Sequence, residues 1–117
     1  MIPAGWHTVT PRVVVSDPAK LVEFLRDVFG ATGDFRTDRP SIIKIGDSQI
    51  MISAVDVREV TPAFLYVYVD DVDATHRRAL KAGAQAIEKP ADLRYGDRRS
   101  MVKDPWGNLW QIAKPLK

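Results

Sequence analysis

The stretch TPRVVVSDPAKLVEFLRDVFGA, residues 10–31, decides the fold, because LYVYVDDVDATHRRALKAGA, residues 65–84, repeats its order of signals. In each stretch a run of β-branched or aromatic residues ends at an aspartate, apolar residues at helical spacing follow, and a glycine closes the segment. Asp17 corresponds to Asp71 and Gly30 to Gly83, with one residue fewer in the second copy. Strand, aspartate, helix and glycine also follow one another by chance, but two copies in the same order favour a true internal repeat.

The capping and turn residues elsewhere in the chain predict that each copy is part of a larger module, with several strands and one helix. In the first module, Asp17 and Pro18 predict a helix start and Gly30 a left-handed helix end. The further elements expected there are a strand at 10–16, a hairpin of strands 41–45 and 49–53 around Gly46-Asp47, and a polar connector at 54–62. The second module is predicted to hold strands at 64–69, 85–88, 99–102 and 109–113 and a helix at 72–82, with a turn at 104–108.

Composition narrows the class of protein. The chain has 117 residues, 45% hydrophobic and 27% charged, which fits one globular domain. Cysteine is absent, so disulfides, thiolate metal sites and cysteine nucleophiles are excluded. No apolar run reaches the ~20 residues of a membrane span, and residues 1–11 lack a signal-peptide pattern, so we expect a cytoplasmic protein without membrane contacts. The net charge of +2 is scattered apart from RYGDRR at 94–99, and no nucleic-acid motif is present.

The quoted stretches, together with IGDSQIMIS at 45–53 and YGDRRSMVKDPWGNLWQIA at 95–113, cover most of the chain. In order and spacing they resemble the vicinal-oxygen-chelate superfamily of glyoxalases, bleomycin-resistance proteins and extradiol dioxygenases. The segment DPWGNLWQIA is similar to that family's closing strand signature. The resemblance implies an α+β fold in which two tandem βαβββ modules form a curved mixed sheet around a cavity. One domain over 1–117 is expected, with modules at about 7–54 and 63–115, and a homodimer whose modules pair within or between chains.

The resemblance also locates the positions that hold a divalent metal in metal-using members. They are Thr10 and Phe64 on the first strand of each module, and Met51 and Gln111 on the last. Divalent metals of this kind prefer imidazole and carboxylate ligands, which none of these four side chains supplies. We therefore expect no metal and no cofactor, and the metal-dependent activities of the family are in doubt.

Only two histidines are available as alternative ligands. His7 is expected to cap a strand end or line the cavity rim, and His76 to be a solvated helical residue. Serine nucleophiles lack a histidine and aspartate nearby in the sequence, and the carboxylates at 70, 71 and 73 are typical of helix capping.

Strand alternation predicts the side chains on the concave face. Flat aromatic rings stack on planar ligands, and arginine pairs with carboxylate or phosphate. A core or dimer-interface role is the alternative, favoured for Tyr68, and Tyr95 is as well explained by a surface loop. Arg12 is expected to pair either with a ligand or with a carboxylate of the protein itself. Trp110 is predicted to be core. The ligand-binding residues expected are Thr10, Arg12, Lys44, Met51, Phe64, Tyr66, Tyr95, Trp106 and Gln111.

Three functions remain in competition. The first is a metal-free protein that sequesters a small planar or anionic organic compound. The second is a metal-dependent lyase or dioxygenase of the glyoxalase type with atypical ligands. The third is a structural or interaction module with a collapsed cavity.

Overall fold

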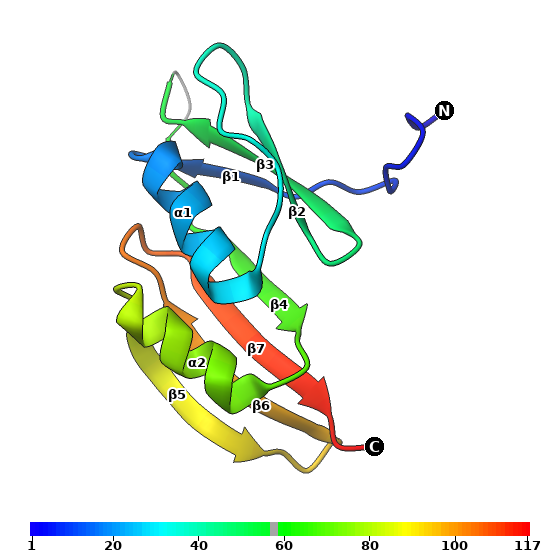
Figure 1. Ribbon diagram of the computed structural model, residues 1–117, viewed down its shortest axis with the longest axis vertical. Helices are drawn as coiled ribbons and strands as arrows, with labels where there is room; N and C mark the ends of the chain where they lie inside the picture. The colour runs from blue at the N-terminus through cyan, green and yellow to red at the C-terminus, as the bar shows by residue number, and fades with distance from the viewer. Residues whose placement is uncertain (57–58) are drawn as a thin grey trace. The chain divides into compact units, whose positions relative to one another are not determined.

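The computed structural model describes residues 1–56 and 59–117, which divide into two compact units, Met1–Thr61 and Pro62–Lys117. Each unit contains one sheet of parallel and antiparallel strands with one helix packed on it (Figure 1). The predicted α+β class and tandem-module fold are therefore confirmed. The connector predicted at 54–62 includes residues 57–58, which lie outside the described part of the chain.

The first unit runs β1 (Arg12–Val15), α1 (Pro18–Phe29), β2 (Ser41–Ile45) and β3 (Ser48–Ala54). The strand order is β1-β3-β2, with β1 parallel and β2 antiparallel to β3. Beyond β2, the outer strand of the module is reduced to a single bridge between Thr32 and Lys44. The strand predicted from residue 10 begins only at Arg12, so Thr10 lies outside the sheet.

Local signals set the bounds of α1 as predicted. The Asp17 side chain accepts a hydrogen bond from the Lys20 backbone nitrogen at 3.1 Å, and Pro18 occupies the first helical position. Gly30 ends the helix in the left-handed region with φ of 66°. The apolar face of the helix is then buried against the sheet, where Val13, Ile43 and Ile52 are buried.

The second unit runs β4 (Phe64–Tyr68), α2 (Val72–Lys81), β5 (Gln85–Asp92), β6 (Asp97–Lys103) and β7 (Leu109–Pro115). Its strand order, β4-β7-β6-β5, repeats that of the first unit and adds a full outer strand. Strand β4 is parallel to β7, and the remaining pairs are antiparallel. Asp71 caps α2 as predicted, by accepting from the Ala74 nitrogen at 3.0 Å. Strand β5 is longer than the expected 85–88 and contains irregular pairing.

The turn between β6 and β7 is organised by one buried carboxylate. Asp104 is 3% exposed and accepts hydrogen bonds at 2.9 Å from the backbone nitrogens of Trp106 and Asn108, from Asn108 Nδ2 and from Trp110 Nε1. Asn108 Oδ1 in turn accepts from the Ala63 nitrogen at 2.9 Å, at the start of β4. The segment that resembles the family signature therefore has a structural role in this unit.

The layer between α2 and its sheet confirms one prediction and corrects another. Trp110 is fully buried, as predicted. His76 was expected to be solvated because arginines follow it, but it is only 5% exposed, and its Nδ1 lies 2.9 Å from Ser100 Oγ of β6. Arg77 and Arg78 are themselves exposed, so the neighbours in sequence are a poor guide to the environment of His76.

Within the described residues, no helix is both long enough and apolar enough to cross a membrane.

Candidate functional site

The face of the second sheet turned away from α2 carries exposed aromatic side chains. Phe64, Tyr66 and Tyr68 alternate along β4 with exposed fractions of 63%, 39% and 61%. Tyr66 pairs with Gln111 of β7, which pairs with Met101 of β6, so these three side chains form one row across this open face. The predicted grouping of Phe64, Tyr66 and Gln111 on one face is thus present in the second unit.

Both tyrosines of β4 are fixed by one carboxylate. The hydroxyls of Tyr66 and Tyr68 donate to Asp97 Oδ2 at 2.6 Å and 3.2 Å. The ring centroids lie 5.4 Å apart with an interplanar angle of 59°, a tilted arrangement that aromatic pairs favour. A ring held by packing at one end and by its hydroxyl at the other loses little further freedom when a ligand stacks on it.

A second group extends the same face along β6. The Arg99 guanidinium donates to the Tyr95 hydroxyl and to Glu88 Oε1, the latter at 3.2 Å, and lies 5.9 Å from the centre of the Tyr95 ring. Tyr95, predicted from its loop position, is therefore part of this hydrogen-bonded group. Because Glu88 pairs with Arg99, that guanidinium is already balanced by a carboxylate.

The surroundings of the two tyrosines keep their hydroxyls protonated. Desolvation, followed by the hydrogen bond to Asp97, raises the pKa of the Tyr66 hydroxyl above its ordinary value of 10.0. Desolvation and the charge of Asp97 also raise the pKa of Tyr68. Both phenols keep their protons at neutral pH and are poor sources of a phenolate base or nucleophile. Within residues 1–56 and 59–117, Asp97 Oδ1 accepts no hydrogen bond, so it is open to a donor on a ligand.

The predicted residues of the first unit lie on the corresponding face of its own sheet. Arg12 of β1 pairs with Met51 of β3, and Lys44 of β2 pairs with Gln49, so their side chains point away from α1. Arg12 Nε donates to Ser53 Oγ at 3.3 Å, a neutral partner in place of the carboxylate considered from the sequence.

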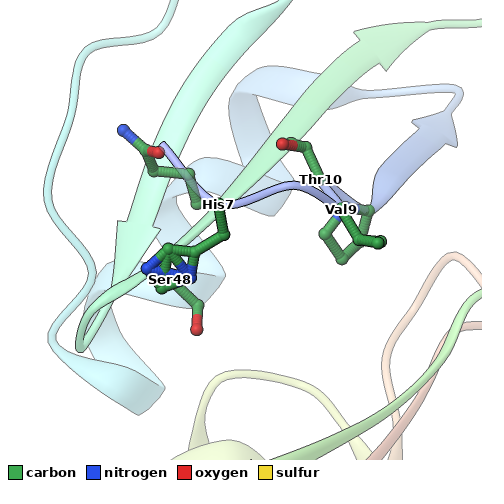
Figure 2. A pocket seen from close by; sticks show the side chains of 6 residues that line it. His7, Val9, Thr10 and Ser48 are labelled. Carbon is green, nitrogen blue, oxygen red and sulfur yellow. The ribbon is translucent and has the colours of Figure 1, made fainter. Parts of the chain in front are cut away.

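Thr10 lies apart from that row. Together with His7, Val9 and Ser48 it lines a hollow of about 190 Å³ at the start of β3 (Figure 2). His7 was expected either to cap a strand end or to line the rim of a cavity, and it borders this hollow. The volume is below the roughly 300 Å³ at which small-molecule sites begin.

Tyr66, Tyr68 and Tyr95, with the charged residues Asp97, Arg99 and Glu88, are called the tyrosine cluster below. Trp106 is not part of it. It lies in the turn before β7, next to the start of β4, whereas Tyr68, Tyr95 and Asp97 lie at the other end of the sheet. The turn instead packs near α2, since an added Cβ at Gly83 would lie 3.6 Å from Pro105.

Sequence reasoning missed the charged members of the cluster. Asp97, Arg99 and Glu88 were not singled out, although alternation along 97–103 puts Asp97, Arg99 and Met101 on one face. Asp97 was missed because the strand was predicted to begin at residue 99, whereas β6 begins at Asp97.

Comparison with known proteins identifies the family. The sequence profile of the Glyoxalase/Bleomycin resistance protein/Dioxygenase superfamily matches residues 7–112. The chain belongs to this superfamily. Protein Mb0911c of Mycobacterium bovis is 29% identical over 128 residues, covering 93% of this chain and 84% of that protein.

Solved structures support the same fold. TioX from Micromonospora sp. ML1 is similar with a TM-score of 0.76 and 24% identity, covering 92% of this chain and 95% of that one. A glyoxalase/bleomycin resistance protein/dioxygenase family enzyme from Burkholderia phytofirmans PsJN gives a TM-score of 0.78 and 23% identity, covering 90% and 95%. At these identities the likeness concerns the fold alone.

The metal that some superfamily members use does not fit the side chains of this one. Thr10, Met51, Phe64 and Gln111 offer a hydroxyl, a thioether, a hydrocarbon ring and an amide. Hard and borderline divalent ions prefer imidazole and carboxylate. In the described part of the chain, no three histidine, aspartate or glutamate side chains come together as a ligand set.

Proposed function

We propose that the chain is a binding protein for a small planar organic molecule, which it holds without a metal on the open face of the second unit. The observation that carries the proposal is the pair of tyrosines whose hydroxyls share Asp97. Exposed aromatic rings are ordinary, but rings anchored through their hydroxyls offer a rigid stacking surface. Gln111 and Met101 continue this surface as an amide and an adaptable thioether.

The charges of the face select among planar ligands. Around the two tyrosines, Asp97 and Glu88 supply two carboxylates, while Arg99 supplies one guanidinium that Glu88 already engages. Lys103 is on the same face by alternation, but it lies at the far end of β6, where it pairs with Leu109. A neutral or cationic planar compound with a hydrogen-bond donor is therefore favoured over a planar anion on this face. The donor would reach Asp97 while the flat body stacks on Tyr66.

Two planar fluorophores test this selection directly. Thioflavin T is cationic and anilinonaphthalene sulfonate is anionic, and binding of either is followed by its fluorescence. We expect thioflavin T to bind more tightly, and Tyr66→Ala to weaken it about tenfold by removing the stacking ring. Tyr66→Phe keeps the ring, so it should cost less than Tyr66→Ala.

Val9→Ala is the matched control, since Val9 is an exposed apolar residue of the first unit. Equal affinity for the two dyes would contradict the charge selection. Unchanged affinity in Tyr66→Ala, with the fold checked by circular dichroism, would remove the proposed site.

Metal content separates this proposal from the alternative of a glyoxalase-type lyase or dioxygenase. Elemental analysis of protein purified without chelators or a polyhistidine tag should find no stoichiometric metal. Addition of Zn²⁺, Ni²⁺, Mn²⁺ or Fe²⁺ should leave the melting temperature unchanged. About one metal per chain would overturn the metal-free proposal and direct the work to lyase and dioxygenase assays. The homodimer stays a prediction, which sedimentation of the purified protein tests.

A further inference from the structure

The first unit contains a hollow that the proposed function does not use, since the residues of that proposal belong to the second unit. It has a volume of about 400 Å³ and is bordered by residues 35–40, by Arg12, by the start of α1 and by the end of β3. This volume falls in the range of small-molecule sites, roughly 300–1,000 Å³. The segment before β2 is held in place because the Arg36 nitrogen donates to Oγ of the fully buried Ser41 at 2.8 Å.

Three arginines border this hollow, and none is fully balanced by a carboxylate in the described residues. Among the residues that the structure describes, Arg12 donates only to the Ser53 hydroxyl. Arg39 meets its neighbour Asp38 at 3.5 Å, with both side chains about two-thirds exposed at 63% and 66%, a geometry that stabilises little. The Arg36 side chain has no ion pair within residues 1–56 and 59–117. Asp38 and Asp56 also border the hollow, so among the described residues that line it cations outnumber anions by one.

The walls between these cations are apolar. Phe35 is 37% exposed and borders the hollow, together with Ile52 and Val55. A guanidinium matches a planar oxoanion in bidentate geometry, whereas an exposed ring and aliphatic side chains match a hydrocarbon body. Both features in one hollow are suited to an amphiphilic anion more than to a bare inorganic ion.

We propose that this hollow of the first unit is a second binding site, which takes a small organic carboxylate. Arg36 and Arg39 pair with the carboxylate, and Phe35 contacts the hydrocarbon part. The site lies wholly within the first unit and does not depend on the planar ligand proposed for the second.

Benzoate, its neutral analogue benzamide, and inorganic phosphate are the probes. Titrations followed by backbone amide chemical shifts should show saturable binding of benzoate, with the largest shifts at residues 35–39 and 52–55. Benzamide has the same shape without the charge and should bind at least tenfold more weakly, since hydrogen bonds to charged groups are about twice as strong as neutral ones. Phosphate carries charge without an apolar body and should also bind more weakly than benzoate.

Arg36→Gln should weaken benzoate binding about tenfold, the effect of losing one charge-assisted hydrogen bond. Arg39→Gln provides a second test at an exposed position, in case the first variant unfolds. Arg94→Gln is the matched control, because it removes the same charge from an exposed loop of the second unit.

Equal binding of benzoate and benzamide would overturn the role of the arginines. Phosphate binding as tight as benzoate would overturn the organic carboxylate in favour of a general oxoanion site. Shifts confined to the second unit would overturn the location. Tyr66→Ala should leave benzoate binding unchanged, so failure at one site is distinguishable from failure at the other.

Discussion

The two units share a strand order and a helix position but differ on the sheet face that the helix leaves open. In the helix-facing layer their residues correspond: Ser41 pairs with Ile52 in the first unit as Ser100 pairs with Ile112 in the second, and all four are buried. On the open face, Arg12 and Met51 occupy the register positions of Tyr66 and Gln111. The module therefore constrains its packed layer, whereas the open face is free to differ.

The units differ also in how their last two strands are joined. In the first unit, Gly46 and Asp47 form a two-residue turn between β2 and β3. In the second, residues 104–108 form a longer turn around a buried carboxylate. Stability should therefore depend on an aspartate in one turn and hardly at all on the aspartate in the other.

Asp104→Ala is expected to have the largest effect, a loss of about 3 kcal/mol or more in the free energy of unfolding. The substitution leaves backbone, amide and indole donors of the buried turn without their acceptor. Urea denaturation measures the loss. Asp47→Ala is the control, because Asp47 is exposed and, in the described part of the chain, its side chain accepts only from its neighbour Ser48. This substitution should change stability by less than about 0.5 kcal/mol. Similar losses in the two variants would show that the comparison of the turns is wrong.

Gly33→Ala tests the shortened outer edge of the first unit. Gly33 follows the Thr32–Lys44 bridge with φ of 113°, and an added Cβ would lie 2.4 Å from the Ile42 carbonyl oxygen. We expect a loss of about 2 kcal/mol from backbone strain and from displacement of the bridge. Thermal and urea unfolding measure it.

Gly46→Ala provides the contrast for this substitution. Gly46 has φ of 58° and nothing within 4 Å of an added Cβ, so only the backbone cost of about 1 kcal/mol applies. A larger loss at Gly46 than at Gly33 would contradict the view that the bridge replaces a strand.

The fold was largely predictable because its signals are local. Asp17, Gly30 and Asp71 act on the adjacent backbone, and the structure confirms each of them. Strand ends were less predictable, since β5 and β6 extend through pairing with each other, which the sequence of either strand alone does not reveal.

The candidate site was predictable only where alternation along one strand was sufficient. The aromatic row of β4 follows from period two, but the partnership of Tyr66 with Asp97 joins strands 31 residues apart in sequence. Likewise, His76 lies in a polar stretch of its own helix. The internal repeat nevertheless makes it the equivalent of Val22 in the first helix, and Val22 is buried. Comparison of the two repeats therefore predicts that His76 is buried, whereas the two arginines that follow it suggest exposure.

That difference between Val22 and His76 predicts the smallest of these effects, a dependence of stability on pH. Burial lowers the pKa of His76 below its ordinary value of 6.5, and Asp73 opposes this shift only in part. The unfolded chain therefore binds a proton before the folded one does, so stability is full above about pH 6.5 and falls as the pH drops toward the folded pKa. Urea unfolding between about pH 7.5 and 5 should show this decline, which His76→Gln should reduce. His7→Gln, at an exposed histidine of the first unit, is the control and should leave this decline in stability unchanged. If His7→Gln abolished the decline and His76→Gln did not, the assignment to His76 would be wrong.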